Sequence, residues 1–508
     1  MSHSALSVHR GAYLDSLLLM ATTVAMEEID GVEWAGAFMG TARGLTDLAT
    51  DGFTSPDLAD LGANDLVLAV RAADSDRAEH ALLAGRHAAL DARDGPRPVQ
   101  GAYVPRSLRE AARARPAASV ALVSVPGEYA ALQAHHALSA GMHVLLFSDG
   151  VPVEEEVELK ERAVRLGRLV MGPGAGTAIL AGTGLGFANV LTTPRGPGAV
   201  GVVAAAGTGA QEVSTLLDRW GVPVSQVIGV GGRDLSDAVD GRMARAAVQI
   251  LDGDDATAVI LLVSKPASAA VAERVLAECR TTPAVAVFLG LQQREVAGIP
   301  VEPTLERGAM RAAELAGVTP PPADRGGSLA RGSRPGRAAV RGLFSGGTLC
   351  YEAQLLLGDL VGPVHSNEPL RPELSLPAAA GAHVLLDLGA EEHTRGVPHP
   401  MIDLTGRLAR LRELRDDPAV AVVLLDVVLG YGGHSDPAGQ LAPVCADLVA
   451  DGIPVVAYVL GTEGDPQGYS GQRATLEAAG CVVPATNARA ACVAAAIALG
   501  RPELAAAG

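Results

Sequence analysis

Apolar runs of strand length alternate with glycine turns and amphipathic stretches over most of the chain, and two segments repeat one pattern. Residues 200–212 read VGVVAAAGTGAQE, and residues 340–352 read VRGLFSGGTLCYE. Each combines a β-type run, a glycine turn and Gly-Thr-x-x-x-Glu at the start of an Ala- and Leu-rich helix. Three later stretches correspond in the same order, beginning at Ile228 and Leu385, at Asp254 and Asp416, and at Pro283 and Ile453. The pattern predicts two copies of one doubly wound α/β unit.

The chain outside the repeat predicts further domains. The first 100 residues follow a βαββα order, with strands at 5–8, 32–39 and 65–69, helices at 14–28 and 76–90, and a loop before the third strand. This order is typical of a small ferredoxin-like or ACT-like α+β module. The α/β rhythm resumes after a Pro-, Gly- and Arg-rich linker that starts at Arg93. We therefore expect domains at 1–100, 101–196, 197–317 and 340–508, with a second linker at 318–339.

The composition narrows the class of protein. The 508 residues allow about three or four domains. A net charge of −17 and a pI of 5.2 argue against binding to nucleic acid, which requires a basic face. No apolar run approaches the ~18 residues of a membrane span. The five cysteines are scattered without CxxC spacing, which fits a reduced cytoplasm and neither a disulfide framework nor a zinc site.

The two glycine turns of the repeat are the first candidate binding site. They contain Gly207, Thr208 and Gly209 in the first copy and Gly346, Gly347 and Thr348 in the second. Backbone N–H groups at a helix start, helped by the helix dipole and by a threonine hydroxyl, can donate to phosphate oxygens. Glu212, one turn further on, could orient a donor or take a proton. The alternative is an ordinary strand-to-helix turn whose glycines permit close packing.

Two loops of the first half carry charged residues. Gly231, Gly232 and Arg233 follow a strand, and the guanidinium offers a fork for phosphate or carboxylate. The alternative for Arg233 is a surface pair with its neighbouring aspartate. The acidic run at 154–156 is expected to be the solvated start of a helix.

The second copy adds candidates for proton transfer. His399 lies between two prolines, and this pinned position suits an acid or base, although a rigid surface loop is the alternative. Asp426 lies inside an apolar strand, so it should have a partner. Gly432, Gly433 and His434 follow that strand at its carboxyl end, where doubly wound sheets bind ligands.

Taken together, these stretches resemble the FdrA family of acyl-CoA-synthetase-like proteins over nearly the whole chain. The resemblance is carried by HRGAYLDS, FMGT, SVPGEYA, FSDGVPVEEEVELK, FANV, GTGAQE, GVGGRDLS, VSKP, GGTLCYEA, PHPMID and LLDVVLGYGGHSDPAG. A broader likeness links the chain to succinyl-CoA synthetase. It implies a Rossmann-like, CoA-binding-type domain at 101–196 and two flavodoxin-like ligase domains. In that enzyme the helix N-termini of the two ligase domains face each other and hold the phosphate of a phosphohistidine.

The departures from succinyl-CoA synthetase bear on the chemistry. The stretch that should carry the phosphohistidine reads LGLQQREVAGIPVEPTLE, from Leu289, and has no histidine. The early CoA-pyrophosphate loop and an ATP-grasp domain are also missing from the sequence. The chain departs from its own family as well, because Gly174 and Ala175 replace the usual Asp-Cys of a glycine loop.

The FdrA resemblance implies a cytoplasmic subunit of a carbamoyltransferase in ureide (allantoin) breakdown. Its substrates would be carbamoyl phosphate and an oxamate-like or other amide or amine acceptor, with no cofactor and with partner subunits in a hetero-oligomer. The glycine turns and Arg233 would stabilise the leaving phosphate, and His399 or His434 would transfer a proton. One alternative is an acyl-CoA synthetase that uses ATP and CoA. Another is a non-catalytic metabolite-binding subunit.

Overall fold

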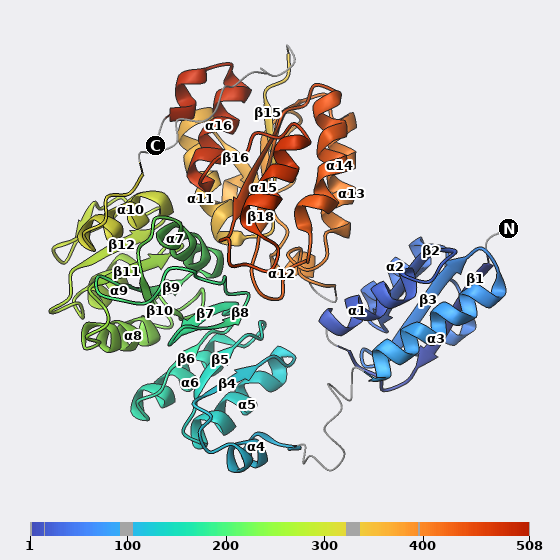
Figure 1. Ribbon diagram of the computed structural model, residues 1–508, viewed down its shortest axis with the longest axis horizontal. Coiled ribbons are helices and arrows are strands. Elements are labelled where there is room, and N and C mark those ends of the chain that lie inside the picture. Colours follow the sequence, from blue (N-terminus) through green and yellow to red (C-terminus); the bar gives the residue numbers. More distant parts are fainter. Residues whose placement is uncertain (1–2, 15, 92–104, 322–335, 395–396, 507–508) are drawn as a thin grey trace. The chain divides into compact units, whose positions relative to one another are not determined.

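The computed structural model in Figure 1 describes residues 3–14, 16–91, 105–321, 336–394 and 397–506. The chain forms two compact units. The first contains Met1–Pro105 and Ala390–Asp403, and the second contains Arg106–Gly389 and Leu404–Gly508. Most of the expected linkers, at 92–104 and 322–335, lie outside the described residues.

The first unit contains a three-stranded antiparallel sheet in the order β1-β3-β2. Its elements are β1 (His3–His9), α1 (Ser16–Glu27), β2 (Val32–Met39), α2 (Ala42–Thr50), η1 (Pro56–Leu58), β3 (Leu66–Ala72) and α3 (Ser75–Asp91). Because side chains alternate along β3, Leu66 and Leu68 join a core with α1 and α3, whereas Val67 and Ala69 face a smaller cluster with Leu48 of α2. This arrangement confirms the small α+β module.

Helix α2 lies in the segment that the sequence predicted as a loop. It is only nine residues long and has Gly44 in its first turn, so its helical pattern is weak. Its start is fixed by Thr41, whose hydroxyl oxygen accepts a hydrogen bond from the Gly44 N–H at 3.1 Å. This capping threonine could have indicated the helix in the sequence.

The second unit contains the two copies of the repeat. The first consists of β9 (Val200–Ala205), α7 (Gly207–Arg219), β10 (Val224–Gly229), α8 (Arg242–Asp252), β11 (Val259–Ser264), α9 (Ala269–Leu276), β12 (Ala284–Phe288) and α10 (Leu305–Leu315). The second consists of β15 (Ala339–Phe344), α11 (Gly347–Val361), β17 (His383–Asp387), α13 (Thr405–Glu413), β18 (Val420–Val428), α14 (Pro437–Ala450), β19 (Val455–Leu460), α15 (Tyr469–Ala478) and α16 (Asn487–Leu499).

The strand order confirms the repeat. The parallel strands run β10-β9-β11-β12 in the first copy and β17-β15-β18-β19 in the second, so each strand has a counterpart at the same position. In Figure 1, α11 and α16 lie on one face of the second sheet and α13 and α14 on the other. Burial on both faces explains why these strands are continuous apolar runs.

The copies differ at the sheet edge beside β10 and β17. In the second copy β17 pairs with the short β16 (Val364–Ser366). In the first, β10 pairs with a hairpin of β7 (Thr177–Leu180) and β8 (Thr183–Gly186). The boundaries expected from the sequence put this hairpin in the segment 101–196, but its strands complete the sheet of the first copy.

The Rossmann-like part forms a separate parallel sheet in the order β4-β5-β6. Its elements are α4 (Leu108–Ala114), β4 (Val120–Val123), α5 (Gly127–Ser139), β5 (His143–Leu146), α6 (Val153–Arg165) and β6 (Val170–Met171). Buried residues of α6 and α8 belong to one hydrophobic core, which joins this sheet to the first copy. Within the described part of the chain, every helix is too short or too polar to span a membrane.

The segment Ala390–Asp403, with α12 (Glu391–Thr394), groups with the N-terminal module. The boundaries expected from the sequence put this segment inside the second copy, at 340–508. The chain leaves the second copy after β17 and returns to it at Leu404. As a result, His399 belongs to the first unit.

Candidate functional site

The turns after β9 and β15 meet at the centre of the second unit. The hydroxyl oxygen of Thr208 accepts a hydrogen bond from the N–H of Thr348 at 3.2 Å. A Cβ on Gly209 would lie 3.0 Å from Cγ2 of Thr348, and a Cβ on Gly346 would lie 2.8 Å from Cγ2 of Thr208. Glycine at these positions therefore lets the N-termini of α7 and α11 touch, which brings two positive helix-dipole ends together.

Asp426 holds the second of these turns in place. Its carboxylate accepts hydrogen bonds from the N–H groups of Ser345 at 2.8 Å and Gly346 at 2.7 Å. The guanidinium of Arg407 donates to the same carboxylate at 2.8 Å, and both side chains are buried. The expectation that Asp426 has a partner is met by Arg407. Because Asp426 occupies these two N–H groups, the geometry gives it a positioning role.

The first turn has no equivalent carboxylate. In the first copy, Val263 of β11 pairs with Ala204 of β9. In the second copy, Leu425 of β18 pairs with Leu343 of β15, and Asp426 is the next residue of β18. The repeat thus places Val263 at the position that Asp426 has in the second copy. The first N–H groups of α7 also lie outside the helix's own hydrogen-bond ladder. The turn at Gly207-Thr208-Gly209 is consequently the more open of the two to an anion.

Two charged side chains that the sequence analysis did not select lie over the start of α11. Asp387 is the last residue of β17, and Lys265 directly follows β11. A Cβ on Gly347 would lie 2.5 Å from Oδ2 of Asp387 and 3.4 Å from Nζ of Lys265. Both residues follow apolar runs at the carboxyl ends of strands, and that position could have identified them in the sequence.

Burial affects the carboxyl group of this pair. Asp387 is 4% exposed. Burial raises the pKa of Asp387 to about 6, and the positive charge of Lys265 partly opposes the shift. The site thus combines two helix N-termini, two threonines, one lysine and one carboxyl group that changes its charge just below neutral pH.

The glutamates of the repeated motif lie between the two copies. Glu212 accepts hydrogen bonds from the hydroxyl of Tyr458 and, at 3.4 Å, from the N–H of Asn487. Glu352 accepts from the N–H of Leu305 at 2.7 Å and from the Asn487 side chain at 2.8 Å. Asn487 begins α16 and Leu305 begins α10, so each glutamate caps the last helix of the other copy. These partners lie outside the glycine turns, and the geometry gives Glu212 a cross-copy capping contact.

The loop after β18 packs on another part of the second unit. A Cβ on Gly432 would lie 3.5 Å from the ring of Phe187, and one on Gly433 would lie 3.5 Å from Nε2 of Gln467. The Nδ1 atom of His434 accepts a hydrogen bond from the N–H of Asp436 at 3.0 Å. These contacts join the expected phosphate-binding glycines to the loop after β8 and to Gln467, rather than to Thr208 and Thr348.

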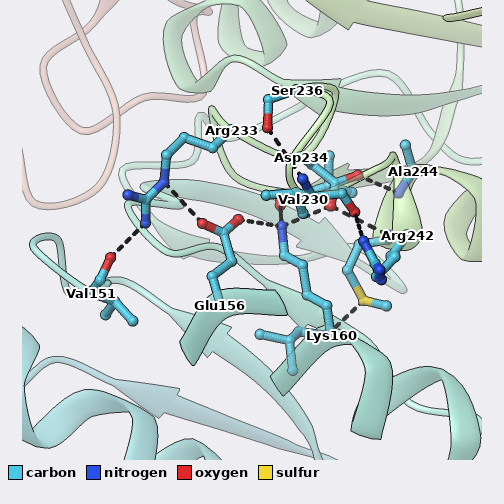
Figure 2. Close-up of polar contacts among 12 residues, drawn as sticks. Val151, Glu156, Lys160, Val230, Arg233, Asp234, Ser236, Arg242 and Ala244 are labelled. Atoms are coloured by element: carbon cyan, nitrogen blue, oxygen red, sulfur yellow. Dashed lines mark hydrogen bonds and ion pairs between the residues drawn. The ribbon is translucent and has the colours of Figure 1, made fainter. Parts of the chain in front are cut away.

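Arg233 belongs to a different charged cluster, which Figure 2 shows. Its Nε lies 2.9 Å from a carboxylate oxygen of Glu156, and its Nη2 donates to the Val151 carbonyl at 2.7 Å. Gly231 has a φ of +90° and lies against the Gly172-Pro173 segment. A Cβ added to Gly231 would lie 2.7 Å from the carbonyl carbon of Gly172. Gly232 is exposed. The guanidinium predicted to bind phosphate is therefore held by Glu156.

Lys160 lies at the centre of this cluster (Figure 2). Its side chain is fully buried. Its ammonium group donates to Glu156 at 2.7 Å, to Asp234 at 2.7 Å and to the Val230 carbonyl at 2.9 Å. Asp234 also accepts from the N–H of Ala244 at the start of α8. The expectation of a solvated acidic run at 154–156 is thus wrong for Glu156, because this side chain points inward to Lys160 and Arg233. The cluster joins α6 to the loop after β10.

His399 lies in the other compact unit. Its Nδ1 accepts a hydrogen bond from the N–H of Met401 at 3.2 Å, and its carbonyl accepts from Ile402 at 2.8 Å. These contacts tie His399 to the residues of its own turn. A role in proton transfer stays a prediction.

Comparisons with known proteins identify the class. Residues 343–497 match the family model described as CoA-ligase, and residues 1–101 match the model described as AllF, heavy metal-associated domain. The chain is 35% identical over 500 residues to the uncharacterized protein YahF of Escherichia coli, which covers 94% of this chain and 95% of YahF. It therefore belongs to the family of YahF, the FdrA family of acyl-CoA-synthetase-like proteins, as the sequence motifs indicated.

More distant relatives are ligase subunits. The chain is 30% identical over 169 residues to the alpha 2 subunit of an ADP-forming succinate–CoA ligase from Archaeoglobus fulgidus, covering 33% of this chain and 56% of the relative. Among solved structures, the match to PH0766 from Pyrococcus horikoshii covers 82% of this chain and 90% of the PH0766 chain, at 16% sequence identity. The TM-score of this match is 0.34.

The heavy-metal name of the N-terminal family does not fit the residues present. All five cysteines lie at position 279 or later, so residues 1–101 contain no thiolate ligand. Over the described ranges, His, Cys, Asp and Glu side chains form no group of three or more that could hold a metal ion. The match therefore describes the fold of this module.

The Lys160 cluster gives the first testable prediction. Lys160→Met keeps the size of the side chain but leaves Asp234 and Glu156 short of a buried partner, so it should cost about 3–5 kcal/mol of unfolding free energy. Arg233→Met, whose side chain is half-exposed, should cost under about 1 kcal/mol. Denaturant unfolding of both variants provides the measurement. A loss of under about 1 kcal/mol in Lys160→Met as well would show that the buried lysine has no special structural role.

The interface glutamates give a prediction on pH. Burial raises the pKa of Glu212 to about 7 and that of Glu352 to about 8, from an ordinary value of 4.5. Since the folded state holds these protons more tightly than the unfolded chain, stability should fall as the pH rises from about 5 to 8. Glu352→Gln should reduce this slope in thermal melting, whereas Glu295→Gln, at an exposed position, should not. An unchanged slope in Glu352→Gln would contradict the assignment.

Proposed function

We propose that this chain is the phosphate-binding subunit of an FdrA-type carbamoyltransferase. Its substrates are carbamoyl phosphate and an amide or amine acceptor of the oxamate type. The observation that carries the proposal is the contact between the N-termini of α7 and α11, with Thr208 and Thr348 at its centre and Lys265 beside it. No other cluster of the described residues combines converging helix N-termini with a lysine.

The geometry suits a phosphate that leaves during the reaction. The first N–H groups of α7 and the two helix dipoles stabilise the charge that develops on the leaving oxygen. The Thr208 hydroxyl accepts from Thr348, so its own hydrogen is available to a phosphate oxygen. Lys265 supplies a full positive charge. This assignment transfers the cationic role expected of Arg233 to Lys265, because Arg233 is paired with Glu156.

The sequence of the loop before α10 supports a substrate that is already activated. Residues 289–306 contain no histidine, and the short strands β13 (Glu295–Val296) and β14 (Ile299–Pro300) form a hairpin there. Without a histidine to carry phosphate, the high-energy bond arrives in carbamoyl phosphate. The proposal requires no cofactor. It includes partner subunits and a cytoplasmic location, as the family resemblance implies.

An acyl-CoA synthetase that uses ATP and CoA is the second candidate. The CoA-ligase match at residues 343–497 and the succinate–CoA ligase relative favour it. The missing phosphohistidine loop weighs against it. A non-catalytic metabolite-binding subunit is the third candidate, and it would bind a phosphate ligand without turnover in the presence of its partners.

Binding of carbamoyl phosphate and inorganic phosphate by calorimetry tests the site. Lys265→Met and Thr208→Val should each weaken binding by about 10-fold or more, since a hydrogen bond to a charged oxygen contributes about 1.5–3 kcal/mol. Thr208→Ser keeps the hydroxyl and should restore binding. Arg233→Met is the matched control and should bind normally. Normal affinity in both Lys265→Met and Thr208→Val would instead make these turns packing features.

Incubation with labelled ATP and magnesium separates the first two candidates. A carbamoyltransferase should carry no acid-labile, base-stable phosphate on this chain, because the histidine loop is missing. Inorganic phosphate release from carbamoyl phosphate is the positive measurement. Phosphate mapped to His399 or His434 would contradict the proposal and favour the synthetase.

A further inference from the structure

The two copies share one frame but contribute different charged groups to the site. Lys265 follows β11 in the first copy, and Val428 is its counterpart at the end of β18. In the second copy, Asp387 is the last residue of β17 and pairs with Phe344. The corresponding pair in the first copy is Gly229 with Ala204, so Gly229 stands at the position of Asp387. Each copy therefore supplies one charge that the other lacks, and the site has one cationic and one acidic side.

Asp387 is held in a fixed orientation. Its N–H donates to Oδ1 of Asn367 at 2.9 Å, and its carbonyl accepts from Nδ2 of Asn367 at 2.9 Å. The Oδ1 atom of Asp387 accepts from the N–H of Gly389 at 2.9 Å. Oδ2 is the atom nearest to a Cβ built on Gly347. One carboxylate oxygen is thus used to fix the side chain, and the other points to the start of α11.

A carboxylate at this position would not stabilise a bound phosphate, because both groups are negatively charged. It lies beside helix N-termini that suit an anion, and Glu368 and Asp426 add further negative charge near it. Such a carboxylate repels a second anion unless that molecule offers it a hydrogen to accept. The nitrogen acceptor of a carbamoyl transfer provides that hydrogen, because its N–H must be lost when the new bond forms.

We propose that Oδ2 of Asp387 accepts the N–H of the acceptor nitrogen and takes its proton during carbamoyl transfer, an inference that rests on the proposed function. The nitrogen attacks the carbamoyl carbon, a C–N bond forms, and the C–O bond to phosphate breaks. Phosphate leaves with the electron pair of that bond, beside Lys265. The proton passes from nitrogen to Asp387 and then to the released phosphate, so atoms and charge balance.

The inference limits the class of acceptor. An acceptor must present an N–H to Asp387, as an amide or an amine does. A substrate that attacks through a carboxylate oxygen, as in a CoA ligase, has no hydrogen to offer there and would face the like charge of Asp387. Because burial holds the pKa of Asp387 near 6, the group is mostly ionised at neutral pH and is still able to accept a proton.

The test uses the full chain with its partner subunits, carbamoyl phosphate and oxamate. Asp387→Asn should bind inorganic phosphate at least as tightly as the wild type, since it removes a negative charge, and should keep its melting temperature. Its kcat should fall by about 100-fold or more, within the range of lost acid–base catalysis. Asp387→Glu should recover part of the rate. Glu368→Gln, which removes a nearby charge, should keep a wild-type kcat.

The pH profile separates a catalytic from a structural role. The wild-type kcat should rise as the pH increases through about 6, where Asp387 loses its proton, and Asp387→Asn should lack this rise. An Asp387→Asn rate within about threefold of the wild type, or a parallel loss of folding and phosphate binding, would overturn the inference alone. A wild-type protein that does not bind phosphate would instead overturn the proposed function.

Discussion

Two helix N-termini pressed against each other are the feature on which the rest of the second unit depends. The starts of α7 and α11 both carry partial positive charge, so their contact through Thr208 and Thr348 is unfavourable by itself. Glu212 and Glu352 lie one turn further along these two helices, cross between the copies and cap the N-termini of α16 and α10. These contacts hold the two copies together. Burial of these glutamates is the cost of that arrangement, and it explains their raised pKa values.

The repeat supplies a symmetric frame, and single residues make it asymmetric. The second turn is filled by Asp426 and Arg407, while the first has Val263 at the same position and stays open. Lys265 comes from one copy and Asp387 from the other. On the proposed function, the duplicated fold provides one site for an anion and a distinct group for a second substrate, without any change in strand order.

The relation to CoA ligases follows from the same residues. The CoA-ligase match covers the second copy, whose turn and strand order equal those of the first. The N-termini of α7 and α11 meet in this chain, whereas the loop at 289–306 has no histidine. On the proposed function, the geometry that binds a phosphoryl group would be kept and the carrier lost, so that an activated small molecule takes its place.

The sequence by itself determined the repeated α/β units, the N-terminal module and the glycine turns. Continuous apolar strands and Gly-Thr helix starts are local patterns with direct structural causes. Even the need of Asp426 for a partner could be read from one polar residue in an apolar strand. The sequence missed α2, whose nine residues give too weak a pattern.

Only the tertiary structure decided which side chains meet. Arg233 and Lys265 both follow strands, yet Glu156 holds Arg233, and Lys265 lies at the start of α11. Glu212 follows the first turn by one helical turn, yet its partners lie about 250 residues away in the other copy, at Tyr458 and Asn487. The physical reason is that periodicity fixes which residues end a strand or face a helix side. The packing of the two copies against each other, through α7, α10, α11 and α16, fixes which of those ends become neighbours.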